Sequence, residues 1–438
     1  MDKKIKILVA GDNGECLPPP YGGIMKKCLM HARVWIENGA EVFMHIHHRH
    51  DKEDKLGAEA VYFYDFKKKP NNFEKILFVL KNFFYNPAFF TKLFFTQKKL
   101  FPNFDLTLFL YCSAKGVEDL KAIKKYKPDI VLFETGCLES LVALLAAKKY
   151  NLPAVLENYA EIQYKSKDDT INIASKYEKL WKYIVNNSDL IISSSVHCSK
   201  GPAAYAENQS KIKIAYSGIN FNAFDGRQFV GEKAEFREKF GLPKDKKIII
   251  SVGAITHARK GHDHIFDAIS LMGERAKDVF LVLCGSGDPS GLISYAASLN
   301  FNEDSFKIFQ RLDEADLAKL YASADCFCFP STTPRECMGL ALKEAMSSGL
   351  PAVAYDSGGI PEAVENGVNG FISPIGDRKA LGENLLKALY LTEEERNKIF
   401  KANISKAEEL FSIKKTASKI LDLCSNLVQN WQNENTFS

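Results

Sequence analysis

The sequence has no Cys-x-x-Cys pair, no uninterrupted apolar run of about 18 residues, and no large excess of either charge. Its ten cysteines are scattered, and only Cys326 and Cys328 lie close together. This distribution is typical of reduced thiols rather than of a disulfide framework. The 58 basic residues nearly balance the 54 acidic ones, giving a formal charge of +4, which argues against a nucleic-acid partner.

The N-terminus has only a short apolar run before Gly11, which fits neither a signal peptide nor a membrane span. We therefore expect a cytoplasmic protein that at most touches the inner face of a membrane. Gly11 and Gly14 follow this run, but the full Gly-x-Gly-x-x-Gly fingerprint is missing. Its absence argues against a dinucleotide-dependent oxidoreductase.

The length and composition indicate two folded domains. The chain has 438 residues, of which 46% are apolar and 26% charged. At roughly 150 residues per domain, it is too long for a single small binding module. The apolar content is also too high for a disordered chain.

Short apolar runs alternate with segments of helical periodicity, a pattern that predicts parallel strands joined by crossover helices. In the first half the expected strands are residues 5–10, 41–47, 129–134, 154–157 and 190–195. The pattern restarts with residues 247–253, 280–285, 307–309, 326–330 and 352–355. We expect an N-terminal domain over 1–215, a second domain over 216–400, and a helical segment over 401–438 that closes the second domain or returns to the first.

A basic, phenylalanine-rich insertion interrupts the first domain at about residues 63–110. Glu74 is the only acid between Lys67 and Lys99, whereas eight lysines fall in this stretch. An interfacial helix on an anionic membrane combines lysines with aromatic residues in this way. A helical insertion whose phenylalanines belong to the core is an equally good interpretation.

The most informative motif is PSTTPRECMGLALKEAM, which begins at Pro330. It contains Glu336 in an expected loop and Glu344 within an expected helix starting near Leu340. At about 1.5 Å per helical residue, the two carboxylates lie on the order of 12 Å apart, beyond the roughly 5–10 Å of a glycosidase pair. The free amides at Met338, Gly339 and Leu340 would hold a diphosphate between them. For either glutamate alone, a solvated helix face is the simple alternative.

Several further motifs accompany this one: YGGI, SDLIISSS, YSGINFNAF, VGAITHARKGHD, LVLCGSGD, LYASADCFCFPS and AMSSGLPAVAYDSGGIPEAVENGVNGF. Together they resemble the retaining glycosyltransferases of family four, over most of the chain. The resemblance implies the GT-B fold, an α/β architecture of two doubly wound Rossmann-like domains facing a central cleft. It also implies transfer of a sugar from a nucleoside diphosphate donor, UDP or GDP, without a metal or cofactor.

The resemblance also implies roles for individual residues. The donor would bind the second domain and the acceptor the first. Glu344 would bind the ribose, Glu336 would approach the sugar, and Lys260 would neutralise the diphosphate, which makes Glu336 and Lys260 the catalytic residues. Gly22 and Gly23 would bring backbone close to the donor phosphate and acceptor, although a bare structural turn is the alternative.

Two positions depart from the family pattern. The arginine usually found after Gly253 is replaced by Ala254, so either Arg259 supplies its charge or Arg259 is ordinary solvated surface. Where the family often has a histidine, this chain has Asn158 and Tyr159. The histidine's role is therefore not transferred.

The His-rich stretch MHIHHRHD contains His45, His47, His48 and His50. Neighbouring imidazoles can share a metal, but no second ligand cluster stands at a recognised spacing. We therefore expect no metal site there.

We expect an enzyme that transfers a sugar to a glycan or lipid-linked acceptor in bacterial cell-surface polysaccharide synthesis. The departures at Ala254 and Asn158 leave a second interpretation open, a catalytically weak relative that binds a nucleotide sugar or glycan as a regulator. A pyridoxal-dependent sugar phosphorylase would share the fold but does not fit this chain length.

Overall fold

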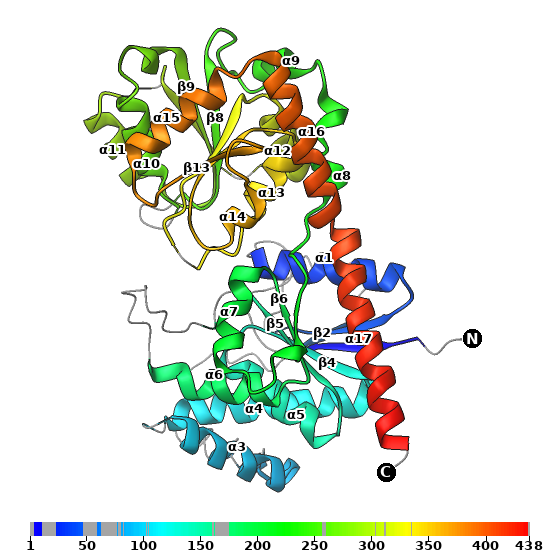
Figure 1. Ribbon diagram of the computed structural model, residues 1–438. Coiled ribbons are helices and arrows are strands. Elements are labelled where there is room, and N and C mark those ends of the chain that lie inside the picture. The colour runs from blue at the N-terminus through cyan, green and yellow to red at the C-terminus, as the bar shows by residue number, and fades with distance from the viewer. Residues whose placement is uncertain are drawn as a thin grey trace. The chain divides into compact units, whose positions relative to one another are not determined.

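The computed structural model describes residues 4–10, 23–46, 59–62, 77, 80–81, 83–101, 103, 105–159, 162, 175–255, 260–302, 304–310, 312–333 and 335–436. The chain forms two compact units (Figure 1). Unit 1 comprises Met1–Tyr216 and Thr416–Ser438, and unit 2 comprises Ser217–Lys415. Each unit has its own sheet.

Unit 1 is built on a seven-stranded parallel sheet with the order β3-β2-β1-β4-β5-β6-β7. The order reverses between β1 and β4, where neighbouring connections leave in opposite directions. Its strands are β1 (Lys6–Ala10), β2 (Glu41–Ile46), β3 (Glu59–Tyr62), β4 (Ile130–Glu134), β5 (Ala154–Asn158), β6 (Leu190–Ser193) and β7 (Ile212–Ile214).

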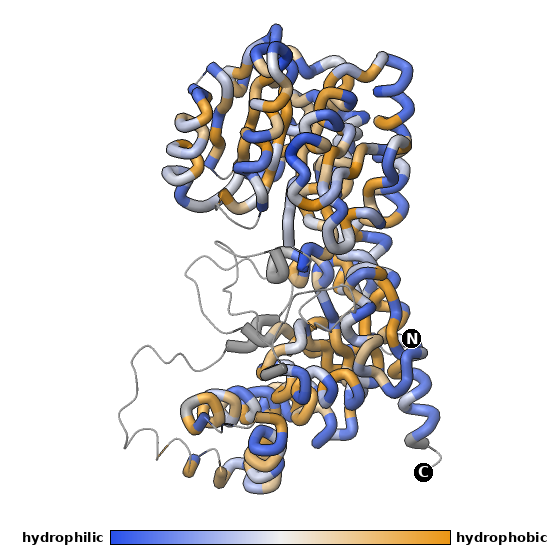
Figure 2. Tube along the Cα trace, turned by 60° about the vertical axis from the view of Figure 1, so that its left-hand side comes forward, coloured by the Kyte–Doolittle hydropathy of each residue, from blue (hydrophilic) through white to orange (hydrophobic). Residues whose placement is uncertain are grey.

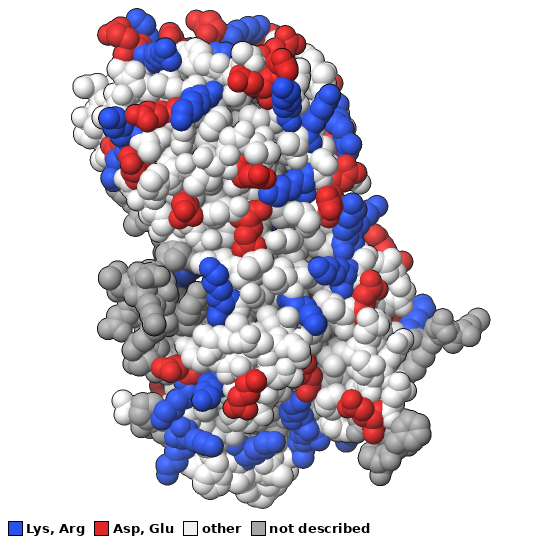
Figure 3. Space-filling model, in the orientation of Figure 1, with Lys and Arg blue, Asp and Glu red and all other residues white. Residues whose placement is uncertain are grey.

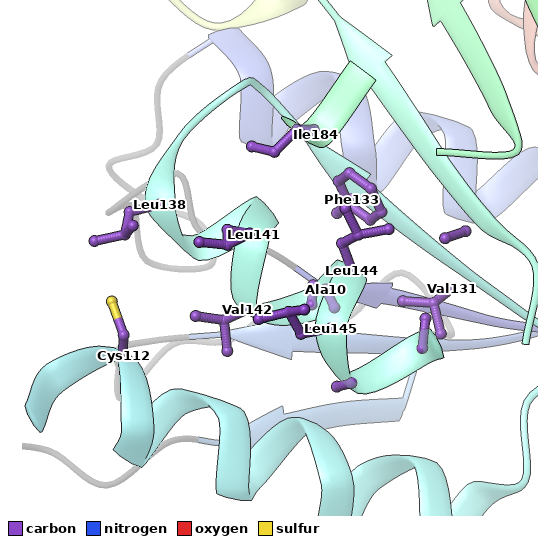
Figure 4. Close-up of a cluster of buried hydrophobic side chains, with 14 of the residues drawn as sticks. Ala10, Cys112, Val131, Phe133, Leu138, Leu141, Val142, Leu144, Leu145 and Ile184 are labelled. Atoms are coloured by element: carbon purple, nitrogen blue, oxygen red, sulfur yellow. The ribbon is translucent and has the colours of Figure 1, made fainter. Parts of the chain in front are cut away.

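Helices cover the sheet of unit 1 because its central strands are apolar on both faces. Their bounds are α1 (Gly23–Glu37), α3 (Pro87–Leu100), α4 (Leu106–Tyr126), α5 (Leu138–Lys149), α6 (Ser175–Asn187), α7 (Val196–Tyr205), the 3₁₀ turn η1 (Gln209–Lys211) and α17 (Ile413–Thr436). Helix α5 is buried on nearly all sides, since every residue from Leu138 to Ala147 other than Glu139 is buried. Figure 4 shows Leu141, Val142 and Leu145 of α5 among the side chains of this core.

Unit 2 is built on a six-stranded parallel sheet with the order β10-β9-β8-β11-β12-β13. The order reverses between β8 and β11. Its strands are β8 (Lys247–Val252), β9 (Val279–Gly285), β10 (Phe306–Gln310), β11 (Cys326–Phe329), β12 (Ala352–Tyr355) and β13 (Gly370–Ser373).

Helices pack on the sheet of unit 2 as well, and Figure 2 shows hydrophobic residues concentrated on the inner elements of each unit. The helices are α8 (Phe221–Phe224), α9 (Lys233–Lys239), α10 (His262–Ser270), α11 (Ser290–Ser298), α12 (Glu314–Ala322), α13 (Leu340–Ser347), α14 (Ile360–Ala363), α15 (Arg378–Leu389) and α16 (Glu393–Leu410). Two 3₁₀ turns, η2 (Gly226–Phe229) and η3 (Gly273–Asp278), complete the unit.

The ten strands expected from the sequence are confirmed to within two residues at each end. The expected C-terminal helical segment forms α16 and α17, and the division between the units falls inside α17. Among the described residues, no helix combines the length and the apolar character needed to cross a bilayer.

The phenylalanines of the insertion divide between two environments. Phe89 is buried, and Phe90 and Phe94 pack partly against the core of unit 1. Phe84 and Phe95, by contrast, are 73% and 62% exposed. The core interpretation therefore holds for only some of these phenylalanines, and contact with a membrane stays a prediction. Residues 63–76 lie outside the described ranges.

Candidate functional site

The candidate site lies where the strand order of unit 2 reverses, at the carboxyl ends of β8 and β11. In an open parallel sheet, connections leaving in opposite directions open a crevice at this point, and ligands bind there. The segments that follow the two strands carry Lys260 and Glu336. The fold thus brings together two residues that lie 76 positions apart.

Lys260 and Glu336 form an ion pair at this end of the sheet. Lys260 Nζ donates a hydrogen bond of 2.6 Å to Glu336 Oε2, and Ser331 Oγ lies 3.2 Å from the same oxygen. Lys260 Nζ also lies 5.3 Å from the centre of the Phe329 ring. The side chains of Lys260 and Glu336 are 27% and 11% exposed, so both remain within reach of a ligand.

Helix α13 begins immediately beside this pair. Gly339 is its N-cap residue, with φ 74° and ψ 131°, and Leu340 is its first residue. A Cβ atom at Gly339 would lie only 2.5 Å from Cζ of Phe329, so both the backbone angle and the packing require glycine. Because a helix leaves its first amides without intrahelical partners, this end can bind an anion.

Glu344 lies in the second turn of the same helix and is buried. The Tyr321 hydroxyl donates to Glu344 Oε2 at 3.2 Å. Burial and the Glu344 carboxylate raise the pKa of Tyr321 well above its ordinary value, so the hydroxyl keeps its proton and remains a donor. The expected arrangement, with Glu336 before the helix and Glu344 inside it, is confirmed.

The turn after β12 supports the loop that carries Glu336. Gly359 N donates to the Glu336 carbonyl at 2.9 Å, and Ser357 Oγ donates to the Thr333 carbonyl at 2.9 Å. Gly358 has φ 58°, and a Cβ there would lie 2.0 Å from the Glu336 carbonyl oxygen. The Ser-Gly-Gly turn thus fixes the backbone of Glu336, a role that the sequence did not reveal.

His262 is a second residue that sequence reasoning missed. It is the first residue of α10, is buried, and its Nδ1 lies 3.3 Å from Ser251 Oγ on β8. A Cβ at Gly253 would lie 3.8 Å from His262 Nε2 and 3.5 Å from Lys260 Cγ. Burial lowers the pKa of His262 to about 4, so the imidazole behind Lys260 is neutral near pH 7.

The other predicted site residues lie in several places, and some of them fall outside the described residues. Met338 is fully buried beside the N-cap, and Gly23 is the first residue of α1 in unit 1. Gly22 and Arg259 lie outside the described residues, and so do His47, His48 and His50. Asn158, where the family often has a histidine, donates from Nδ2 to the Cys198 carbonyl at 2.7 Å. Within the described ranges no three His, Cys, Asp or Glu residues are grouped to hold a metal.

Comparison with known families matches residues 232–406 to the family described as glycosyl transferases group 1. The match includes β8, Lys260, Glu336 and α13, and hence the whole candidate site. The resemblance to glycosyltransferases drawn from the sequence is therefore confirmed for this part of the chain, the group 1 domain.

A curated relative is similar to part of this chain. An uncharacterised glycosyltransferase of Methanocaldococcus jannaschii is 33% identical over 165 residues, which cover 37% of this chain and 40% of the relative. The chain spans from 40% to 64% of the length of such curated relatives.

Solved structures confirm the fold of the whole chain as GT-B. A glycosyltransferase from Rickettsia africae ESF-5 is similar with a TM-score of 0.70 at 19% identity, over 98% of this chain and 99% of that one. Anabaena HepE in complex with UDP-glucose has a TM-score of 0.69 at 17% identity, over 96% and 100% of the two chains. The group 1 domain thus offers, at one crevice, a cation, a carboxylate and a helix N-terminus.

Proposed function

We propose that the protein transfers a sugar from a nucleoside diphosphate sugar, UDP or GDP, to an acceptor hydroxyl with retention of anomeric configuration. One observation carries the proposal: the N-terminus of α13 opens at the switch point of the group 1 domain, beside Lys260 and Glu336. Helix amides and an ammonium group together suit a pyrophosphate.

Each residue of the proposed donor site has a separate role. Lys260 and the amides of Met338, Gly339 and Leu340 hold the diphosphate, Glu344 binds the ribose, and Glu336 binds the donor sugar. The Lys260–Glu336 ion pair keeps both side chains close together, and we propose that phosphate and sugar meet beside it. Arg259, Gly22 and Gly23 complete the proposed donor site.

The proposed reaction needs neither a metal nor a cofactor. The bond from the anomeric carbon to the phosphate oxygen breaks, the acceptor oxygen attacks the same face, and the leaving phosphate takes the acceptor proton. Negative charge grows on the diphosphate as this bond breaks. Fixed cations and amide dipoles stabilise such charge more than water does, because they are already oriented.

Replacing Lys260 by Ala tests this assignment. Hydrogen bonds to charged groups contribute about 1.5–3 kcal/mol, so we expect kcat/KM for the donor to fall about tenfold to a hundredfold. Lys277→Ala, at an exposed lysine of the same unit, is the matched control. A thermal-shift screen of UDP, GDP and ADP, each with and without a sugar, would first identify the donor. Equal kinetics of Lys260→Ala and wild type would exclude Lys260 from the site.

A binding protein without turnover is the second candidate function. Ala254, where the family has an arginine, favours it. A nucleotide sugar would then raise the melting temperature by binding the folded state without releasing free nucleotide. Release of UDP or GDP from any donor excludes this candidate.

We propose further that the acceptor is a glycan or lipid-linked sugar of bacterial cell-surface polysaccharide, met at the cytoplasmic face of an anionic membrane. Helix α3 supports this. Its buried face contains Phe89, Leu93 and Gln97. At about 100° per residue, Phe95 lies on the opposite side of the helix from Leu93. Its helical neighbours there are the exposed lysines Lys92, Lys98 and Lys99.

Lysines flanking an exposed aromatic ring suit a lipid headgroup layer, because the ring can enter the interface while the ammonium groups meet phosphates. No acidic residue falls between Lys81 and Leu100. Figure 3 shows Lys and Arg side chains grouped over the part of unit 1 in which Figure 1 labels α3. The surface is therefore both apolar and basic.

Vesicle co-sedimentation tests this surface. We expect the protein to bind phosphatidylglycerol vesicles at low salt and not phosphatidylcholine vesicles. Phe95→Ser should weaken binding at least fivefold, whereas Val230→Ser, at a residue of unit 2 that is 73% exposed, should leave it unchanged. Equal binding of the two variants, or no binding of the wild type at low salt, would remove the membrane from the proposal.

A further inference from the structure

His264 of α10 and Tyr355 of β12 form a hydrogen bond at the carboxyl end of the sheet of unit 2. The Tyr355 hydroxyl lies 3.0 Å from His264 Nδ1, and the two rings meet edge to face with their centroids 5.7 Å apart. Tyr355 is fully buried, and the side chain of His264 is 13% exposed. We call these two residues the His–Tyr pair.

Tyr355 connects the pair to Glu336. It is the last residue of β12, and its carbonyl accepts a hydrogen bond of 2.9 Å from Ser357 N. Ser357 begins the Ser-Gly-Gly turn, which donates hydrogen bonds to the carbonyls of Thr333 and Glu336. A shift of Tyr355 would therefore move this turn and, with it, the backbone of Glu336.

His264 connects the pair to Lys260. It lies in the first turn of α10, and its amide donates to the Gly261 carbonyl at 3.0 Å. Gly261 has φ 66°, and a Cβ atom there would lie 2.2 Å from the Pro330 carbonyl oxygen, so the start of α10 packs tightly against the segment after β11. Lys260 directly precedes Gly261. A shift of His264 would therefore move Lys260.

We propose that the His–Tyr pair positions Lys260 and Glu336 for sugar transfer, because its hydrogen bond joins the start of α10 to the turn after β12. This inference rests on the proposed function. Neither member of the pair touches the ligand, so both are positioning residues. Their hydrogen bond fixes the spacing between the ammonium group and the carboxylate. A displacement of about 1 Å in such a site can slow a reaction about a hundredfold.

The hydrogen bond runs from the phenol to the imidazole near pH 7. Burial raises the pKa of Tyr355, so its hydroxyl keeps the proton. Burial also lowers the pKa of His264, so the imidazole is neutral. Within the part of the chain that the structure describes, Nδ1 is the hydrogen-bond partner of the Tyr355 hydroxyl. Nδ1 is therefore the acceptor, and Nε2 carries the imidazole proton.

The side chains that face the pair are charged or titratable, and they come from four elements: Asp263 and Asp267 of α10, Tyr295 of α11, Cys328 of β11, and Asp377 and Arg378 at the start of α15. Asp263 Oδ2 lies 3.9 Å from His264 Nε2. Asp267 accepts hydrogen bonds from Arg378 Nε at 2.5 Å and from the Tyr295 hydroxyl at 2.6 Å. Histidine is the side chain whose ordinary pKa falls between about 5 and 8, so mild acidification acts on His264.

Protonation of His264 at Nδ1 would remove the acceptor of the His–Tyr pair. The buried phenol proton of Tyr355 would then have no partner in the pair, which destabilises the arrangement. The link between the start of α10 and the turn after β12 should therefore weaken as the pH falls.

Tyr355→Phe tests the inference because it removes the hydroxyl and keeps the ring. We would measure the kinetics of the full-length protein with the nucleotide sugar that the thermal-shift screen identifies. We expect kcat to fall at least about fivefold, with a smaller change in the donor KM. Tyr295→Phe removes a neighbouring hydroxyl that donates to Asp267 and is the matched control, which should keep the wild-type kcat.

An unchanged kcat in Tyr355→Phe would contradict the inference. Absence of turnover in the wild type would count against the proposed function instead.

Two substitutions of His264 separate the hydrogen bond from packing, and they also decide the matter should Tyr355→Phe fail to fold. Asn carries an oxygen that can replace Nδ1 as acceptor, whereas Leu fills the space without one. We expect His264→Asn to retain most of the wild-type kcat and His264→Leu to lose as much as Tyr355→Phe. Equal losses in the two His264 variants would show that the hydrogen bond does not position the site.

The pH dependence distinguishes a positioning role from a purely structural one. The ratio of the wild-type kcat to that of Tyr355→Phe should fall toward one as the pH drops from about 7.5 to about 5, because protonated His264 no longer accepts the phenol proton. The ratio of His264→Asn to Tyr355→Phe should stay constant, because Asn does not titrate. A wild-type ratio that is also constant would overturn the inference.

Discussion

At the scale of single residues, the group 1 domain combines a partly exposed ion pair with several buried polar groups. Lys260 is partly exposed and paired with Glu336, whereas Glu344, Tyr321 and His262 are buried. Buried groups with defined partners keep their positions, and a partly exposed ion pair can exchange partners when an anion arrives. In the proposed donor site, Lys260 and Glu336 would therefore change partners on binding a diphosphate, whereas the buried residues would keep their positions.

His262 gives the protein a testable dependence of stability on pH. Its pKa is about 4 in the folded protein, against 6.5 for the ordinary value. Above pH 6.5, His262 is neutral in both the folded and the unfolded protein, so its protonation does not lower the free energy of unfolding. As pH falls toward 4, the unfolded chain binds a proton that the folded one does not, so stability falls by about 3 kcal/mol. Urea unfolding at several values between pH about 7 and about 5 measures how the free energy of unfolding depends on pH. We expect this free energy to fall less steeply with decreasing pH in His262→Asn than in the wild type. Equal slopes would contradict a neutral buried His262.

The residues of the candidate site differ in how readily the sequence reveals them. Glu336, Gly339 and Glu344 are close in sequence, and their spacing on a loop and a helix start could be predicted. Outside the candidate site, the buried Lys27 and His31 of unit 1 were missed, although they are four residues apart and Trp35 continues their line along α1. Charged residues in the inward line of a helix are the signal that could have found them. Their partners Glu134 and Glu157 are distant in sequence, and only the sheet register brings them together.

At the scale of elements, the start of α13 matters most. Gly339→Ala would place a methyl group against the Phe329 ring and hold alanine at φ 74°. We expect the unfolding free energy to fall by about 2–3 kcal/mol, and UDP affinity to fall as well, because the helix amides shift.

Gly367→Ala is the matched control for this change. Gly367 has φ 80°, and a Cβ atom added there would have nothing within 4 Å, so this variant has the same backbone strain without the clash. Urea unfolding and UDP titration of both variants separate the two effects. A Gly339→Ala protein that binds UDP as wild type does would show that the helix start is not part of the donor site.

Strand prediction succeeded for every central strand and for the edge strand β10, and it missed the three other edge strands. The three strands that the sequence did not reveal, β3, β7 and β13, are all edge strands of three or four residues. A central parallel strand is covered on both faces and reads as a continuous apolar run. The residues of β7 are half-buried or exposed, so no such run marks it.

At the scale of the whole molecule, two units of the same general construction hold different charged groups where their strand orders reverse. The switch point of unit 2 offers a helix N-terminus and Lys260, which suit an anion. That of unit 1 holds Glu134 and Glu157 beside Lys27, all with side chains that are 5% exposed or less. We propose that the anionic donor binds unit 2 and the acceptor unit 1.

Binding of the donor diphosphate at the N-terminus of α13 is the proposal on which the others depend. A crystal structure of the full-length protein with UDP or GDP, whichever binds more tightly, would show it. We expect phosphate oxygens within hydrogen-bond distance of the Gly339 and Leu340 amides and of Lys260 Nζ, with the ribose against Glu344. A nucleotide bound elsewhere, with the Lys260–Glu336 pair undisturbed, would refute the proposed donor site.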